Sequence, residues 1–425
     1  MCPEIGEKAL LNTCQKNALR ILNAPGNVFL TGVAGSGKSF LIRYFLKDKK
    51  PKVFPILAST GAAAILVGGR TFHSFFGLGI MQGGFDVTVD RALSSKKLGK
   101  RLLKAQGVII DEISMLSGTT LRAAETISRL VRNDKSPWGG LKVIVVGDFA
   151  QLPPVNPYGR EKDWAFQDST WEKSQFTPAL LKTTVRTKEL DFVEILNQVR
   201  DGEVTATVTE FLNSRQHIFE EDDFDGTVLF PRRDITERYN LTQLGKIEGK
   251  EFAFETIYSG DDRFLEGMMK NSPIPQMLTL KIGALVMIRQ NDPRGRWHNG
   301  SLGHIKSVSH DILKISLFEG STAEIEKVAF TTLDAEGKEV ASAINFPVNL
   351  AYAATIHKAQ GMTLDRVTID LSHLWEPGQA YVALSRAKSA KGLFITNWSP
   401  TSIKSDPVVR EFNRKLWEST TESEI

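Results

Sequence analysis

The sequence predicts an α/β protein with parallel sheets, in two domains that each carry a small insertion. Three observations support this fold class. A glycine-rich loop joins a buried apolar strand to a helix at residues 28–46. Further apolar strands alternate with helices to about residue 155, and the same alternation resumes over residues 350–397. Between them, residues 275–345 are short strands and turns, which is typical of a small antiparallel barrel.

The composition is that of a globular protein in a reducing compartment. The 425 residues leave room for two to four domains, and 41% hydrophobic and 24% charged residues are ordinary values. Cys2 and Cys14 are the only cysteines, which argues against a disulfide framework or a zinc site. A net charge of +4 permits a polyanionic partner without requiring one. No apolar run reaches about 18 residues and no targeting signal is evident, so we expect a cytoplasmic, bacterial-type protein with no membrane partner.

The strand, loop and helix at residues 28–46 contain a phosphate-binding pattern. Gly32, Gly37, Lys38 and Ser39 fit G-x-x-x-x-G-K-[ST]. In such loops the backbone N–H groups surround one anion, the lysine reaches the β- and γ-phosphates, and the hydroxyl ligates Mg²⁺. We therefore expect ATP as substrate and Mg²⁺ as cofactor. The expected ATP contacts in the loop are Gly32, Ala34, Gly35, Ser36, Gly37, Lys38 and Ser39.

An amphipathic helix at residues 10–22 precedes the loop. It carries Gln15, whose amide could both donate to and accept from an adenine edge. An exposed helix glutamine is an equally good interpretation.

Two later strand ends supply acidic and amide groups. The apolar strand 108–110 ends in Asp111 and Glu112, the Walker B form. Asp111 would hold hydrated Mg²⁺, and Glu112 would orient and deprotonate the attacking water. A later apolar strand, 143–146, leads to Gln151. Because parallel strands direct their carboxyl ends at one crevice, we expect Gln151 near the γ-phosphate.

Residues of about 80 to 104 depart from this alternation and carry a basic cluster at near-helical spacing. The cluster could face a nucleic-acid backbone, or it could be a solvated helix face. Aromatic residues just before it could stack on bases, although core positions suit most of the phenylalanines better. The basic residues are Lys96, Lys97, Lys100, Arg101 and Lys104.

These motifs, in this order, resemble the PIF (petite integration frequency) DNA helicases, relatives of the RecD-type helicases in superfamily I. The resemblance extends over residues 10–397, essentially the whole chain. Its most specific stretches are 60–64, 69–75, 111–116, 147–155, 355–361 and 381–386.

The resemblance implies two RecA-like P-loop domains with ATP in the cleft between them. The first would be 1–171, with a wedge insertion at about 76–104, and the second 172–425, with a β-barrel insertion at about 275–345. The implied activity is ATP-driven 5′-to-3′ translocation on single-stranded DNA, with unwinding of duplexes, DNA–RNA hybrids and G-quadruplexes. The implied partners are single-stranded, forked or G-quadruplex DNA, bound by a monomeric motor.

The resemblance also assigns roles to single residues. Arg186 and Arg386 match two arginines that reach the γ-phosphate from the second domain, and their alternative is that of ordinary surface arginines. Residues 185–187 read Val-Arg-Thr where the family often has Phe-Arg-Gln. The implied catalytic residues are Lys38, Glu112, Gln151, Arg186 and Arg386. Gln360 and Gly361 are implied on the ATP site, and Thr60, Gly61, His73, Asn299, His357 and Lys358 on the DNA.

Three other functions share part of this pattern. An ATP-driven single-strand translocase or RNA helicase would keep every motif without separating DNA strands. A nucleotide-switched nucleic-acid-binding protein would not need Glu112, Gln151 and both arginines for turnover. A small-molecule kinase would share only the phosphate loop.

Overall fold

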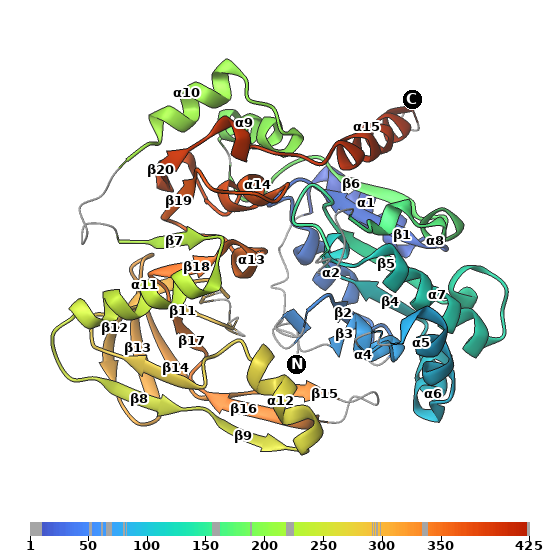
Figure 1. Cartoon of the computed structure of the whole chain (residues 1–425), viewed down its shortest axis with the longest axis horizontal. Helices are drawn as coiled ribbons and strands as arrows, with labels where there is room; N and C mark the ends of the chain where they lie inside the picture. The colour runs from blue at the N-terminus through green and yellow to red at the C-terminus, as the bar shows by residue number, and fades with distance from the viewer. Residues whose placement is uncertain are drawn as a thin grey trace. The chain divides into compact units, whose positions relative to one another are not determined.

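The structure is a computed structural model in which the chain packs into two units, each built around a parallel sheet (Figure 1). The first unit comprises Glu7–Val185, Thr331–Ala341 and Pro407–Ile425, and the second comprises Arg186–Phe330 and Ser342–Asp406. None of the helices described is long and apolar enough to cross a membrane. The structure describes residues 11–50, 53–60, 63–64, 70–79, 81, 83–154, 162–187, 189–217, 225–290, 292, 294, 296–297, 299–333 and 339–422.

A six-stranded sheet forms the centre of the first unit. Its strand order is β3-β2-β4-β5-β1-β6, and every neighbouring pair is parallel. Strands β1 and β4 are buried at every position, as strands between two helical layers are. The strands are β1 (Val28–Gly32), β2 (Ile56–Ala58), β3 (Arg70–Thr71), β4 (Gly107–Ile110), β5 (Lys142–Gly147) and β6 (Thr177–Leu181).

Helices α1 and α2 share one apolar core with the central strands of this sheet. The predicted helix at 10–22 is α1, and the helix that follows the phosphate loop is α2. The other helices of the first unit include short 3-10 turns. The helices are α1 (Thr13–Asn23), α2 (Lys38–Leu46), α4 (Phe72–Phe76), α5 (Gly84–Leu93), α6 (Lys96–Lys104), η1 (Ile113–Met115), α7 (Gly118–Arg132), η2 (Pro137–Gly140), η3 (Ala165–Gln167), α8 (Ser169–Lys173) and α15 (Pro407–Glu422).

The predicted departure at about 80–104 is a pair of helices, α5 and α6, that pack against α7 and add no strand to the sheet (Figure 1). Leu98 and Leu102 of α6 are buried. Arg101 donates from Nε to the carbonyl oxygen of Phe75 at 3.0 Å, so it ties α6 to α4. The four lysines of the basic cluster are exposed.

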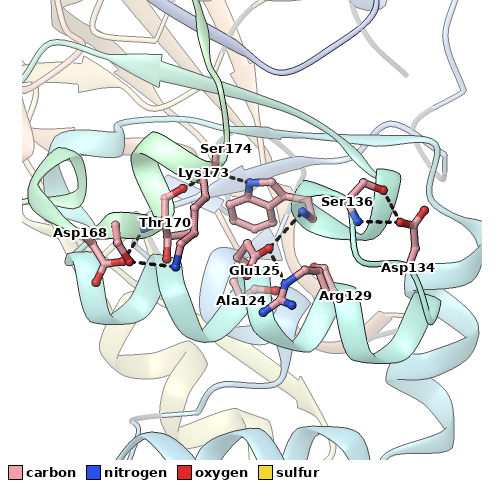
Figure 2. Close-up of polar contacts among 12 residues, drawn as sticks. Ala124, Glu125, Arg129, Asp134, Ser136, Asp168, Thr170, Lys173 and Ser174 are labelled. Carbon is pink, nitrogen blue, oxygen red and sulfur yellow. Dashed lines mark hydrogen bonds and ion pairs between the residues drawn. The ribbon is translucent and has the colours of Figure 1, made fainter.

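A polar network joins α7 to α8 around the buried ring of Trp138 (Figure 2). The indole Nε1 donates to Ser174 Oγ at 2.8 Å, and the backbone N–H of Trp138 donates to Glu125 Oε1 at 3.3 Å. Glu125 also accepts from Arg129 Nε at 2.8 Å. The network fixes α7, the helix that follows the Asp111–Glu112 pair, because each buried polar group in it has a partner.

The first unit extends beyond its predicted limit at residue 171. Strand β6 pairs with β1 along its whole length, and helix α15 returns from the end of the chain to this unit. The ring of Phe412 in α15 stacks on Phe166 with centroids 4.2 Å apart and packs edge-on against Phe149. The division between the units therefore falls after Val185, and residues 407–425 belong with the first unit.

The second unit contains a four-stranded parallel sheet of order β18-β7-β19-β20. This sheet confirms the predicted return of the α/β alternation after residue 350. Its strands are β7 (Thr227–Phe230), β18 (Ala353–Thr355), β19 (Val367–Leu371) and β20 (Leu393–Trp398). The helices of the unit are α9 (Leu190–Asp201), α10 (Ala206–Ser214), α11 (Arg233–Lys246), α12 (Asp262–Asn271), α13 (Ile356–Ala359), α14 (Gln379–Leu384), η4 (Ala390–Gly392) and η5 (Pro400–Ser402).

Short strands occupy the predicted insertion at 275–345 and the residues beside it, and those of the largest sheet pair antiparallel. Five of them form a sheet of order β14-β13-β12-β11-β17 around an apolar core that includes Ile288, Ile315 and Phe346. Smaller groups are β10-β8 and β15-β16-β9. Closure of these strands into a barrel stays a prediction. The strands are β8 (Phe252–Glu255), β9 (Ile257–Gly260), β10 (Met277–Leu280), β11 (Leu285–Ile288), β12 (Leu302–Val308), β13 (Ile312–Leu317), β14 (Thr322–Glu326), β15 (Val328–Leu333), β16 (Glu339–Asn345) and β17 (Val348–Leu350).

Candidate nucleotide and nucleic-acid sites

The phosphate-binding loop lies between the end of β1 and the start of α2, and two of its glycines are required by space. A Cβ atom at Gly32 would lie 2.4 Å from the carbonyl oxygen of Leu181 in β6. Gly37 has φ 88°, and its Cβ would lie 2.8 Å from the amide nitrogen of Gln15. The buried hydroxyl of Ser36 has no hydrogen-bond partner in the part of the chain that is described. The left-handed backbone at Gly37 and this unsatisfied hydroxyl fit a loop that binds a phosphate-bearing ligand.

The side chain of Lys38 is held over the phosphate loop by backbone carbonyl groups of that loop. Its Nζ donates to the carbonyl oxygens of Gly32 at 2.8 Å and Val33 at 3.3 Å. Ser39 follows in the first turn of α2, where its side chain is exposed. The lysine ammonium and the serine hydroxyl therefore both lie at the mouth of the loop.

Gln15 is buried, so its interpretation as an exposed helix glutamine is wrong. Its side chain is 4% exposed and closes a capping box with Asn12 at the start of α1. Gln15 Oε1 accepts from the backbone N–H of Asn12 at 3.2 Å, and Nε2 points at the carbonyl oxygen of Ser36 at 3.5 Å. The amide thus links α1 to the phosphate loop, which places it at one border of the nucleotide site.

The acidic pair stands at the end of β4. Glu112 has the left-handed φ of 52°, and its backbone N–H donates to Asp111 Oδ1 at 3.0 Å. Burial, then the charge of Glu112, raises the pKa of Asp111 to about 7, although the hydrogen bond from the Glu112 backbone and the charge of Lys38 both act to lower it. The Asp111 carboxylate and the Lys38 ammonium are therefore close enough to interact.

Gln151 lies on the loop after β5, the strand beside β4. Its side chain is 6% exposed, and its backbone N–H donates to the carbonyl oxygen of Asp148 at 3.0 Å. A Cβ at Gly147 would lie 3.1 Å from the backbone nitrogen of Ile113. The exit of β5 therefore abuts the segment that follows Glu112, so the carboxyl ends of β1, β4 and β5 bring their functional residues to one edge of the sheet.

Thr184 contacts the phosphate loop, although no sequence motif marks it. Its hydroxyl donates to the carbonyl oxygens of Gly35 at 3.3 Å and Ala34 at 3.4 Å. The next residue, Val185, donates its backbone N–H to Gly35 at 2.8 Å. The segment that leads into Arg186 is thus hydrogen-bonded to the loop.

A metal ion at this site would have few protein ligands. Among the residues described, no three His, Cys, Asp or Glu side chains gather in a metal-binding group. Mg²⁺ is commonly held by one or two protein oxygens together with phosphates and water, so the oxygens of Ser39 and Asp111 fit this ion.

Arg186 and Arg386 lie together in the second unit. Arg186 donates from Nη1 to the backbone oxygen of Ser385, and Arg386 donates from Nη2 to the hydroxyl of the same serine at 2.7 Å. Arg386 also donates from Nε to Val382 at 2.8 Å and is 2% exposed, which excludes a surface role. Burial, then the charge of Arg386, lowers the pKa of Arg186 to about 9. The two guanidinium groups therefore repel each other.

Two predicted DNA contacts belong to the first unit, and Gly61 lies outside the described residues. Thr60 is exposed beyond β2, and its hydroxyl accepts from the backbone N–H of Ala63 at 3.2 Å. His73 is half-buried in α4, and burial lowers the pKa of its imidazole. The phenylalanines beside it, Phe72 and Phe75, are buried, so they are core residues rather than stacking platforms.

The remaining predicted contacts belong to the second unit. His357 and Lys358 lie on α13, and each side chain is in part accessible to solvent. The protein around them still removes some of their hydration, which lowers the pKa of both side chains. Gln360 ends this helix, and Gly361 follows with φ 80°. Asn299 stands apart in sequence, on the turn between β11 and β12.

The fold and the phosphate loop together define a P-loop nucleotide-hydrolysing enzyme with two parallel sheets. Comparison with known proteins narrows this class. Residues 10–210 match the family described as PIF1-like helicase. The ATP-dependent DNA helicase Pif1 of Bdellovibrio bacteriovorus is 52% identical over 95% of this chain and 91% of the relative. The chain spans 64% of the zebrafish relative of the same name.

Two crystal structures of a Bacteroides Pif1 resemble the chain over nearly its full length. The complex with ADP-AlF4 has a TM-score of 0.84 and 27% identity, and covers 97% of this chain and 98% of that one. The complex with ADP-AlF3 and single-stranded DNA has a TM-score of 0.67 and 28% identity, with the same coverage. The chain belongs to the PIF1-like helicase family, whose members named here are ATP-dependent and therefore ATP-hydrolysing enzymes.

Proposed function

We propose that this protein is an ATP-dependent DNA helicase that translocates 5′ to 3′ on single-stranded DNA. The observation that carries the proposal is the nucleotide site of the first unit. There Lys38 lies over the phosphate loop and interacts with Asp111, and Glu112 follows directly. Support for DNA as the substrate comes from the name of the Bdellovibrio relative and from the Bacteroides complex with single-stranded DNA.

In this proposal ATP occupies the loop from Gly32 to Ser39, with Gln15 at the border of its base. Ser39 and Asp111 would hold Mg²⁺, which supplies charge neutralisation at the β- and γ-phosphate oxygens when bound. Lys38 exchanges its carbonyl partners for phosphate oxygens. Because anions are stronger acceptors than backbone carbonyls, this exchange is favourable.

Hydrolysis needs a base and a stabiliser of developing charge. Glu112 takes the proton from the attacking water, and the amide of Gln151 orients that water or the γ-phosphate. Arg186 and Arg386 stabilise the charge on the transferring phosphoryl group. Their mutual repulsion supports this role, since an anion beside both groups would relieve it. Gln360 and Gly361 are proposed to contact the nucleotide from the same unit as the arginines.

Thr60, Gly61, His73, Asn299, His357 and Lys358 are proposed to contact the DNA strand. Single-strand grip of this kind is mostly electrostatic and salt-dependent, with stacking adding about 1–3 kcal/mol per base. The proposed substrates extend to forks, DNA–RNA hybrids and G-quadruplexes, and the proposed motor is a monomer.

Tailed duplexes test the proposal. We expect the wild-type protein with Mg-ATP to separate a DNA duplex that carries a 5′ single-stranded tail and to leave a matched duplex with a 3′ tail intact. A non-hydrolysable ATP analogue is the control. Separation of neither duplex, with ATP hydrolysis retained, would indicate a translocase without strand separation. Separation of RNA duplexes alone would indicate an RNA helicase, and either result contradicts the proposal.

A further inference from the structure

Arg289 is a buried cation with poor compensation of its charge. It follows β11, where its backbone N–H donates to Pro347 at 2.7 Å, and its side chain is 6% exposed. Its Nη1 contacts the sulfur atoms of Met287 at 3.5 Å and Met362 at 3.7 Å. Its Nε has no hydrogen-bond partner among the described residues. Because a thioether is a weak acceptor, these contacts leave the guanidinium poorly satisfied within the part of the chain that is described.

Two acidic residues of this region, Asp292 and Glu237, are engaged by other arginines. Asp292, three positions along the chain, accepts from Arg296 Nη2 at 2.7 Å and Nε at 3.0 Å. Glu237 of α11 pairs with Arg233 at 2.6 Å. Desolvation, then the charges of Arg233 and Arg289, lowers the pKa of Lys358, so these cations lie near one another. Arg289 therefore has a second cation, Lys358, in its neighbourhood, and the charge of Glu237 only partly offsets the effect of these cations on the pKa of Lys358.

Arg289 also lies between the two stretches of the second unit that are proposed to contact DNA. On one side, Ile288 exchanges hydrogen bonds with the turn that follows Asn299, since Gly300 donates to its carbonyl at 2.9 Å. On the other side, Arg289 contacts Met362, which follows the segment that carries Lys358. A strand that touched both stretches would pass the guanidinium.

We propose that Arg289, together with Lys358, binds a backbone phosphate of the single strand, so that Arg289 is a DNA-binding residue of the second unit. The inference rests on the proposed function. A phosphodiester would supply the charged oxygen acceptors that Met287 and Met362 cannot, and charge-assisted bonds to such oxygens are the strong ones. A buried cation that contacts weak acceptors also lowers the stability of the folded state, and a bound phosphate would offset that cost.

The test replaces Arg289 by methionine, which removes the charge and suits the apolar surroundings. Binding of a fluorescent oligo-dT is measured by anisotropy over a range of salt concentrations, alongside thermal unfolding without DNA. We expect Arg289→Met to bind about tenfold more weakly than wild type, with the slope of log affinity against log salt reduced by about 0.7, the value for one phosphate contact on a single strand. We expect its unfolding midpoint to equal or exceed that of wild type, because a buried unpaired charge has been removed. The matched control is Lys306→Met, which removes an exposed cation from β12.

Two results would overturn the inference. The first is that Arg289→Met has the affinity and the salt slope of the wild type. The second is that Arg289→Met has a lower unfolding midpoint and an affinity loss that a stabilising osmolyte restores. The second result would show that Arg289 is a structural residue. Failure of the wild-type protein to bind oligo-dT would instead contradict the proposed function. The two failures are therefore distinguishable.

Discussion

The phosphate loop of the first unit and the arginines of the second unit hold their charges in opposite ways. Lys38 donates to backbone carbonyl groups of the loop, and the amide of Gln15 bonds to the backbone of Asn12 and of Ser36. Arg289 has sulfur atoms in place of oxygen acceptors, and Arg186 lies against the like charge of Arg386. The loop is therefore built before its ligand arrives, whereas the cations of the second unit gain stability when an anion arrives. We expect binding in the second unit to depend more strongly on salt.

The largest expected effect concerns the nucleotide site of the first unit, which is formed before the ligand binds. Glu112→Gln removes the base without disturbing Lys38, so ATP should still bind while kcat falls by about 10²–10⁴-fold. Phosphate release and the binding of a fluorescent nucleotide measure the two properties separately. Glu172→Gln, an exposed change on α8, is the matched control. Turnover near the wild-type rate in Glu112→Gln would remove Glu112 from the mechanism.

Substitutions of the two arginines should have different effects on stability and the same effect on catalysis. Arg386 is 2% exposed and bonds to Val382 and Ser385, so Arg386→Ala should lower the free energy of unfolding by about 3 kcal/mol. Arg186 is only partly buried, and Arg186→Ala should cost about 1 kcal/mol or less. Both variants should lose ATP turnover. Urea unfolding and ATPase assays on the pair check this contrast, and a catalytically active Arg186→Ala would contradict it.

The last expected effect is smaller than that of Arg386→Ala and depends on pH, and it concerns Asp292, which bonds to Arg296. Its hydrogen bonds with Arg296 hold the pKa of Asp292 at about 2, below the ordinary 3.8. This contribution to stability is present above pH 3.8 and is lost as pH falls towards 2. Asp292→Asn should therefore cost about 2 kcal/mol at neutral pH and much less in acid. Equal unfolding differences at pH 7 and pH 3 would show that Asp292 acts through its shape alone.

Much of the first sheet could be predicted from the sequence. The apolar runs at 28–30, 108–110 and 143–146 mark β1, β4 and β5, because a central parallel strand is buried on both faces. Strand β6 was harder to assign, since it is an edge strand that contains Pro178 and chain order does not say which sheet it joins. Helix α15 lies beyond the last predicted strand, and the packing of Phe412 against Phe166 shows that it belongs to the first unit.

The candidate site was predictable where a motif fixes the backbone. The glycines and Lys38 could be identified by spacing, and the spacing of Asn12 and Gln15 matches a capping box. The contact of Thr184 with the loop joins residues about 150 positions apart, so no local pattern reveals it. The contacts of the Arg289 guanidinium with two sulfur atoms are likewise a property of the folded surroundings, which a list of residues cannot show.

The most direct test of the account is the ATPase rate of the wild-type protein with and without oligo-dT, beside that of Lys38→Ala. Lys47→Ala, an exposed change just beyond α2, is the matched control. We predict that the oligonucleotide accelerates hydrolysis in the wild type and in Lys47→Ala, and that Lys38→Ala hydrolyses at least about 10²-fold more slowly in its presence. An ATPase rate that the oligonucleotide does not change, or an ATPase rate that Lys38→Ala retains, would contradict the account.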